Sequence, residues 1–282
     1  MRTRKHSGIA RRSPLTAPQR HLREATSCLT TILPQLDLVH LTSTGVGREI
    51  VNAGKLEARE CQVFGESLAY FFLARPVYRL PAGDDKSDHI GLFPFGFVCS
   101  PENLGHPYHV FPFDSGAAHK GFYNQKLSRS DFLEDFALEP TLDGARKHIE
   151  WAFGTNAAYY QGDLRQGLAD TIEEWHTVAK GFVRIAGLAA SGSNSPDHRA
   201  ASIEIAYAEH VPLKGNVRLV IMPKQFIENP RTSSKNKELL DRLDELGIQW
   251  DVYDWRANET PNFYLDEIAR IVQQHLRKQG QL

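Results

Sequence analysis

Three separated stretches of this sequence carry polar residues that could together break a glycosidic bond. His40 lies in the apolar run 38–42, Arg75 ends an aromatic run that begins at Tyr70, and Glu204 is the one carboxylate in the run 202–207. If strands brought these side chains into one cleft, the carboxylate would stabilise the positive charge that develops on a ribose as its bond to the base breaks. The set therefore indicates cleavage of an N-glycosidic bond to a positively charged leaving group.

The residues of the first two stretches each have a structural alternative. In a cleft, the ring nitrogens of His40 would bond ribose hydroxyls, and Thr42 would add its own hydroxyl from the same side of the strand. His40 could equally be a core histidine with its bonds satisfied inside the protein. Tyr70 and Phe71 could form a flat wall for an aromatic ligand, or they could simply be core residues.

Arg75 and Glu204 also leave two interpretations open. Because an unpaired guanidinium is costly in apolar surroundings, Arg75 needs a partner. A diphosphate would satisfy its planar set of donors, and so would an ion pair with Glu66 or Asp114. Glu204 could act on the reaction, or it could face solvent, as glutamates on half-buried strands often do.

The order of helical and strand patterns predicts an α+β fold, because the elements do not alternate as strict βαβ units. Thr42, Ser43 and Thr44 offer an N-cap for a helix over 45–53, which Gly54 would close. Apolar or alternating runs predict strands over 36–41, 68–78, 202–207, 217–222 and 249–253, and helical spacing predicts helices over 22–33, 235–246 and 263–278.

Composition limits the classes of function. The 282 residues are 41% apolar, and the formal net charge is -1, so the chain as a whole has no strong preference for polyanions or membranes. No apolar run approaches bilayer length, so no membrane association is expected. His106, His109, His119 and Asp114 match no standard zinc spacing, so no metal site is predicted. The three widely spaced cysteines predict no disulfide framework and favour a cytoplasmic location, and they are Cys28, Cys61 and Cys99.

The first 21 residues are predicted to form a flexible basic arm. Such an arm could contact nucleic acid phosphates, or it could be a solvated terminus without a ligand. Seven basic residues stand against only Glu24 in the opening segment: Arg2, Arg4, Lys5, Arg11, Arg12, Arg20 and Arg23.

Three patches of the chain resemble the ADP-ribosyltransferase superfamily, and they look most like its DarT-like branch of toxins that modify nucleic acid bases. His40-Leu-Thr42, followed by the helix up to Gly54, is similar to the first strand and helix of that fold. The run 69–78 is similar to its aromatic strand with an arginine, and the run 199–205 is similar to the strand that carries its catalytic glutamate.

The resemblance implies a split, mixed β-sheet core with flanking helices, and NAD as the substrate without a metal. It implies that His40, Arg75 and Glu204 are catalytic. The resemblance also implies two binding sets: His40, Thr42, Tyr70, Arg75 and Tyr78 for NAD, and Asp197, His198, Arg199 and Asp114 for the acceptor.

The same resemblance implies an acceptor class and a biological role. A nucleic acid acceptor is expected, within a toxin–antitoxin or phage-defence role that could include a neutralising protein partner. Ser202 stands where transferases that modify arginine carry Gln or Glu, which argues against arginine as the acceptor.

The expected domain organisation is a catalytic domain over 22–232, with an insertion around 81–195, and a C-terminal αβα extension over 233–282. Two alternatives to the transferase remain. One is an NAD glycohydrolase of the same fold, in which water is the acceptor. The other is a non-catalytic module that binds nucleic acid or protein.

Overall fold

The computed structural model describes residues 8–11, 21–80, 83–127, 131–189, 197–228 and 234–282. They form two compact units. Unit 1 comprises the described residues up to Gln35, the segment Gln62–Gly65 and the segment His106–Ala206, and unit 2 comprises Leu36–Cys61, Glu66–Gly105 and Tyr207–Leu282.

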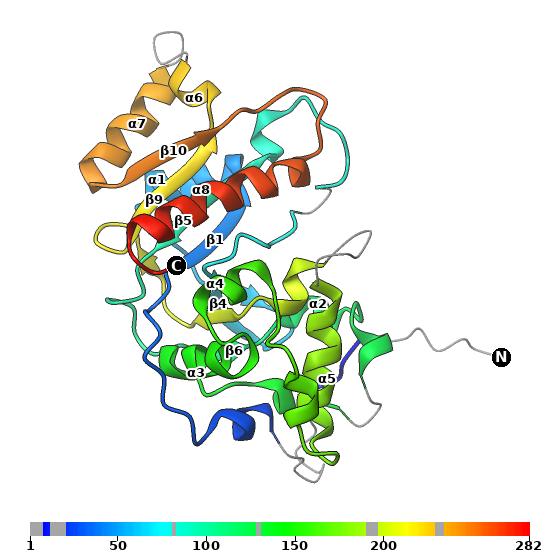
Figure 1. Ribbon diagram of the computed structural model, residues 1–282. Coiled ribbons are helices and arrows are strands. Elements are labelled where there is room, and N and C mark those ends of the chain that lie inside the picture. The colour runs from blue at the N-terminus through cyan, green and yellow to red at the C-terminus, as the bar shows by residue number, and fades with distance from the viewer. Residues whose placement is uncertain (1–7, 12–20, 81–82, 128–130, 190–196, 229–233) are drawn as a thin grey trace, which may run out of the picture. The chain divides into compact units, whose positions relative to one another are not determined.

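Unit 2 is built on a mixed β-sheet (Figure 1), in which neighbouring strands follow the order β10-β9-β5-β1-β4 and β3 pairs with β4. The pair β9–β10 is parallel, and the other pairs of this sheet are antiparallel. The mixed sheet agrees with the α+β prediction. The strands are β1 (Leu38–Ser43), β3 (Arg59–Cys61), β4 (Glu66–Leu73), β5 (Pro94–Cys99), β9 (Val217–Pro223) and β10 (Gln249–Tyr253), and a separate small pair joins β2 (Lys55–Leu56) to β8 (Val211–Pro212).

The helices of unit 2 begin and end close to the predicted positions. Helix α1 ends at Ala53, and Gly54 adopts the left-handed conformation (φ 69°) that a glycine accepts without strain. The tail follows the predicted helix–strand–helix order, and α8 contacts strands β5 and β10. The helices are α1 (Thr44–Ala53), α6 (Gln225–Glu228), α7 (Ser234–Leu246) and α8 (Leu265–Lys278), and short 3-10 turns cover Ile90–Leu92 and Pro261–Tyr264.

Unit 1 is mainly helical and contains the antiparallel strand pair β6–β7. Its core is aromatic: Phe113 packs against Tyr123 and Phe136, and His148 packs against Phe182. The strands are β6 (His109–Phe111) and β7 (Glu204–Tyr207), the helices are α2 (Ser115–His119), α3 (Leu142–Ala152), α4 (Asn156–Gln161) and α5 (Thr177–Ala186), and 3-10 turns cover Leu22–Thr26, Asn124–Lys126, Leu133–Phe136, Leu168–Thr171, Gly187–Ala189 and His198–Ala201.

Two predicted elements extend well beyond the observed ones. The strand predicted over 68–78 ends at Leu73, because Ala74 turns into the left-handed region (φ 58°) and takes the chain out of the sheet. The helix predicted over 22–33 is a 3-10 turn of five residues, Leu22–Thr26. The threonines and the serine over 26–31 have low helix propensity, so the turn does not extend into a longer helix.

Part of the predicted basic arm is packed into unit 1. Ile9 is 5% exposed, and its amide donates to the carbonyl of Ala118. Arg11 forms an ion pair with Glu134 at 2.7 Å, and its guanidinium lies over the ring of Phe64. Residues 1–7 and 12–20 lie outside the described residues.

Two further observations concern membrane-spanning helices and the cysteines. None of its described helices combines the length and the apolar character that crossing a membrane requires. Cys28, Cys61 and Cys99 all carry free thiols.

Candidate active site

The strand pair β6–β7 places Glu204 beside a histidine. Phe111 faces Glu204, and His109 faces Ala206. Residues that face one another, and residues two apart on a strand, share one side of the pair, so His109 and Glu204 are diagonal neighbours. His109 Nε2 lies 3.3 Å from Glu204 Oε1, and both side chains are almost fully buried. The sequence prediction of a strand at Glu204 is confirmed, but this carboxylate does not face solvent.

The carboxylate of Glu204 is fixed by the residue that opens α2. The hydroxyl of Ser115 donates to Oε1 at 2.5 Å, and its backbone N–H donates to Oε2 at 3.2 Å. The backbone before Glu204 is also held: the amide of Ile203, the residue that precedes β7, donates to the hydroxyl of the buried Tyr159 at 3.0 Å. A carboxylate held in this way is oriented before any ligand arrives, which is the condition for electrostatic stabilisation of a developing cation.

Asp114 is the second acid of this site. It caps α2, because its Oδ1 accepts the N–H of Ala117 at 2.7 Å. Burial raises the pKa of Asp114 to about 6, and the negative charge of Glu204 adds to that rise. The bond from Ala117 and the charge of Arg199 act in the opposite direction. Two acids whose negative charges repel each other therefore lie near the start of α2.

The predicted acceptor loop leads directly into Glu204. Asp197 caps the 3-10 turn His198–Ala201, and its two carboxylate oxygens each accept a hydrogen bond from the guanidinium of Arg199 at 2.9 Å. The guanidinium also lies over the ring of Phe122, 5.0 Å from its centre, and this ring is 60% exposed. The carbonyl of Arg199 accepts the N–H of Asp114 at 3.2 Å. Asp197, Arg199 and Asp114 thus belong to one local structure, and the exposed His198 lies in its turn.

Ser115 provides a direct test of the fixed carboxylate. Ser115→Ala removes the hydroxyl donor to Glu204, and hydrogen bonds to charged groups contribute about 1.5–3 kcal/mol. If Glu204 is catalytic, we expect kcat for NAD cleavage to fall about 10- to 100-fold, measured by steady-state release of nicotinamide. Thr26→Val is the matched control, since it removes another buried hydroxyl of unit 1, one that donates to the carbonyl of Arg23. Equal kcat in the two variants would contradict this role for Ser115.

In unit 2, β1 carries His40 with a defined hydrogen bond. Its Nδ1 lies 2.8 Å from the carbonyl of Tyr70, and its ring lies between Phe71 and Phe97. Burial lowers the pKa of His40, and the charge of Arg59 acts in the same direction. The ring is therefore neutral at pH 7, so Nδ1 donates to the carbonyl and Nε2 is left as an acceptor. An acceptor nitrogen suits the hydroxyl of a ribose.

The other predicted NAD contacts of unit 2 differ in exposure. Thr42 lies two residues after His40 on β1, so both are on one face of the strand, and both are half-buried. Tyr70 is half-buried, and its hydroxyl donates to the Sγ of Cys61 at 2.9 Å. Tyr78 lies beyond the end of β4 and is 40% exposed. In the β1–β4 pair Val39 faces Phe72, so Tyr70, two residues before Phe72, lies on the opposite face of the sheet from His40 and Thr42. The structure thus does not bring the ring of Tyr70 to the face that carries His40.

Arg75 follows the bend at Ala74 and is 4% exposed. Its backbone N–H donates to the carbonyl of Leu73 at 2.7 Å, and its carbonyl accepts the N–H of Val77 at 3.1 Å. Both bonds belong to tight turns that flank the arginine. A buried guanidinium on a fixed backbone is suited to a diphosphate.

Sequence reasoning missed two members of the Glu204 site. The sequence indicated His109 only as a possible metal ligand, and Ser115 was assigned no role. Within the residues that the structure describes, no three His, Cys, Asp or Glu side chains are grouped so that they could hold a metal ion. The available signals were the alternation of His109 with Phe111 and the Asp114–Ser115 pair three residues after Phe111. Both gain meaning only once β6 is paired with β7.

No protein-family model and no curated protein matches this sequence. Two of the solved structures that are similar to this chain are of one protein. One solved structure is Thermus sp. 2.9 DarT in complex with NAD+, with 14% identity and a TM-score of 0.39, and the match covers 78% of this chain and 97% of that one. The same protein in complex with carba-NAD+ gives 12% identity and a TM-score of 0.37, with 78% and 96% covered.

Proposed function

We propose that this protein is an NAD-dependent ADP-ribosyltransferase that releases nicotinamide. The observation that carries the proposal is the buried carboxylate of Glu204, held in one orientation by both donors of Ser115. As the bond between nicotinamide and ribose breaks, positive charge develops on the ribose, and Glu204 stabilises that charge. Glu204 also polarises the incoming nucleophile.

The residues of unit 2 bind NAD in this proposal. Neutral His40 accepts a hydrogen bond from a ribose hydroxyl through Nε2, and Thr42 adds a hydroxyl from the same face of β1. Tyr78, whose ring is exposed, contacts the nicotinamide ring, and Arg75 binds the diphosphate with its planar donors. No metal takes part in the proposed reaction.

The acceptor in this proposal is a nucleic acid, and the residues Asp197, His198, Arg199 and Asp114 contact it. The exposed ring of Phe122 under the guanidinium of Arg199 supports this class, since aromatic rings and guanidinium planes stack on unpaired bases. The proposed role is that of a cytoplasmic toxin or defence effector with a neutralising protein partner.

The experiment that tests the proposal offers NAD labelled in its adenylate part to DNA, to RNA and to a protein pool. Label transfer to nucleic acid, together with release of nicotinamide, is the expected result. Release of nicotinamide without transfer would assign an NAD glycohydrolase instead. Absence of both NAD binding and turnover would overturn the enzyme and leave the non-catalytic binding module.

A further inference from the structure

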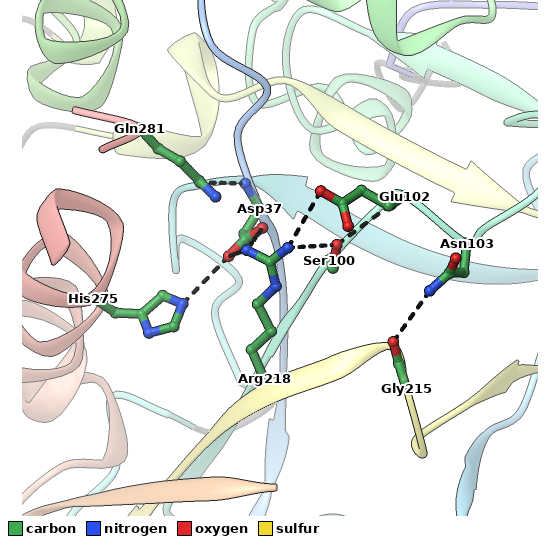
Figure 2. A network of polar contacts seen from close by, with 8 residues as sticks. All are labelled: Asp37, Ser100, Glu102, Asn103, Gly215, Arg218, His275 and Gln281. Carbon is green, nitrogen blue, oxygen red and sulfur yellow. Dashed lines mark hydrogen bonds and ion pairs between the residues drawn. The ribbon is translucent and has the colours of Figure 1, made fainter. Parts of the chain in front are cut away.

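Asp37 lies directly before β1 in unit 2 and is 1% exposed, at the centre of a polar cluster (Figure 2). Its carboxylate lies 3.3 Å from a guanidinium nitrogen of Arg218 and 3.3 Å from Nε2 of His275. Its backbone N–H donates to the side-chain oxygen of Gln281 at 2.8 Å. A buried carboxylate requires compensation, and here it comes from Arg218 in β9 and His275 in α8, both far from Asp37 in sequence.

Arg218 reaches Asp37 because of a β-bulge. In the pair β5–β9, Cys99 faces Val217 and Val98 faces Leu219, so Arg218 is the extra residue. A bulge redirects the side chain of its extra residue. The guanidinium of Arg218 also donates to the hydroxyl of Ser100 at 2.9 Å, which fixes its position against β5.

The segment after α8 brings Gln281 to Asp37. Gly280 takes the left-handed conformation (φ 67°) just beyond the helix, and the N–H of Gln281 then donates to the carbonyl of Leu276 at 3.0 Å. This is the bonding of a Schellman motif, which needs a residue that accepts positive φ. The motif reverses the chain and presents the side chain of Gln281 to Asp37, while His275 reaches the same residue from the last turn of α8.

Asp37 in turn holds the bend that precedes Arg75. Its carbonyl accepts the N–H of Ala74 at 2.8 Å. Ala74 is fully buried with φ 58°, a conformation that costs free energy for any residue with a Cβ and persists only where neighbours enforce it. Arg75 is the next residue, so the direction in which its side chain leaves the backbone depends on this bond.

We propose that Asp37, held by Arg218, His275 and Gln281, is a positioning residue for Arg75. The clasp, meaning these four residues, acts on NAD affinity through the Ala74 bend and not by contact with NAD. This inference rests on the proposed function only in its assumption that Arg75 binds the diphosphate. It assigns a role in the NAD site to α8 and the residues that follow it.

The test compares Gln281→Met with Gln274→Met in the full-length protein. The first removes the acceptor for the N–H of Asp37 at nearly constant side-chain size, and the second makes the same change at an exposed position of α8. We expect Gln281→Met alone to speed hydrogen exchange of the Ala74 amide. KM for NAD should rise about tenfold, equivalent to about 1.4 kcal/mol of binding free energy, with kcat unchanged. The Gly54 amide, bonded within α1, reports any general loss of stability.

Faster exchange at Ala74 and Gly54 alike, or unchanged exchange at Ala74, would overturn the positioning role. A selective change at Ala74 with unchanged KM would overturn it as well, because the bend would then not govern Arg75. If the unmodified protein neither binds nor cleaves NAD, the proposed function fails instead. The exchange rates of Ala74 and Gly54 still decide in that case whether the clasp holds the bend.

Discussion

Glu204→Gln is expected to lower kcat for NAD cleavage by about 10²–10³-fold, the usual loss when one fixed electrostatic group is removed from an active site. The substitution keeps the shape of the side chain but removes its negative charge. That charge acts on the cation formed during bond breakage and much less on bound NAD. We therefore expect the Kd for NAD, measured by calorimetry, to stay close to that of the unmodified protein.

The matched control is Glu209→Gln, an exposed glutamate a few residues further along the chain. It makes the same chemical change outside the site and should leave kcat unaltered. A Glu204→Gln variant that folds, binds NAD and turns it over at the original rate would show that this buried carboxylate has no part in the reaction. Loss of NAD binding together with turnover would instead make Glu204 a binding or structural residue.

Where the end of a helix or strand depends on one residue type, the sequence predicted that end. Gly54 closes α1 because it alone among nearby residues accepts positive φ without strain, and that end is visible in the sequence. The end of β4 is different. An alanine in the left-handed conformation has no sequence signal, because the carbonyl of Asp37, far back in the chain, holds it there.

The site was predictable to the same extent. The strand position of Glu204 followed from the alternation around it, while the roles of His40 and Arg75 stay predictions. The partners of Glu204 did not follow, because His109 and Ser115 reach it only through the register of β6 against β7. Register between strands almost a hundred residues apart depends on tertiary packing, which one sequence does not reveal.

Asp114→Asn is expected to stabilise the protein at neutral pH. The folded protein raises the pKa of Asp114 from 3.8 to about 6, so the folded state binds this proton more tightly than the unfolded state does. The stability that comes from the proton is fully present below about pH 4 and is lost as the pH rises through about 6. Asparagine carries no such proton, and its side-chain oxygen can still accept the N–H of Ala117.

The size of the effect follows from linkage between protonation and folding. We expect the free energy of unfolding of Asp114→Asn to exceed that of the unmodified protein by about 3 kcal/mol at pH 7.5 and by only about 1 kcal/mol at pH 4.5. Urea unfolding at both pH values measures it, and Asp163→Asn, at an exposed position, is the control. A difference that does not grow with pH would contradict the raised pKa.

A gain in stability from one substitution would also show that the native aspartate is kept at the cost of stability, which is common for residues that act in a site. If Asp114 acts on the acceptor, label transfer to nucleic acid should fall in Asp114→Asn, while nicotinamide release continues with water as the acceptor. An equal loss of both would place Asp114 in NAD cleavage beside Glu204. Because the cap on α2 is preserved in this variant, either result reports on the charge of Asp114 and not on the position of Ser115.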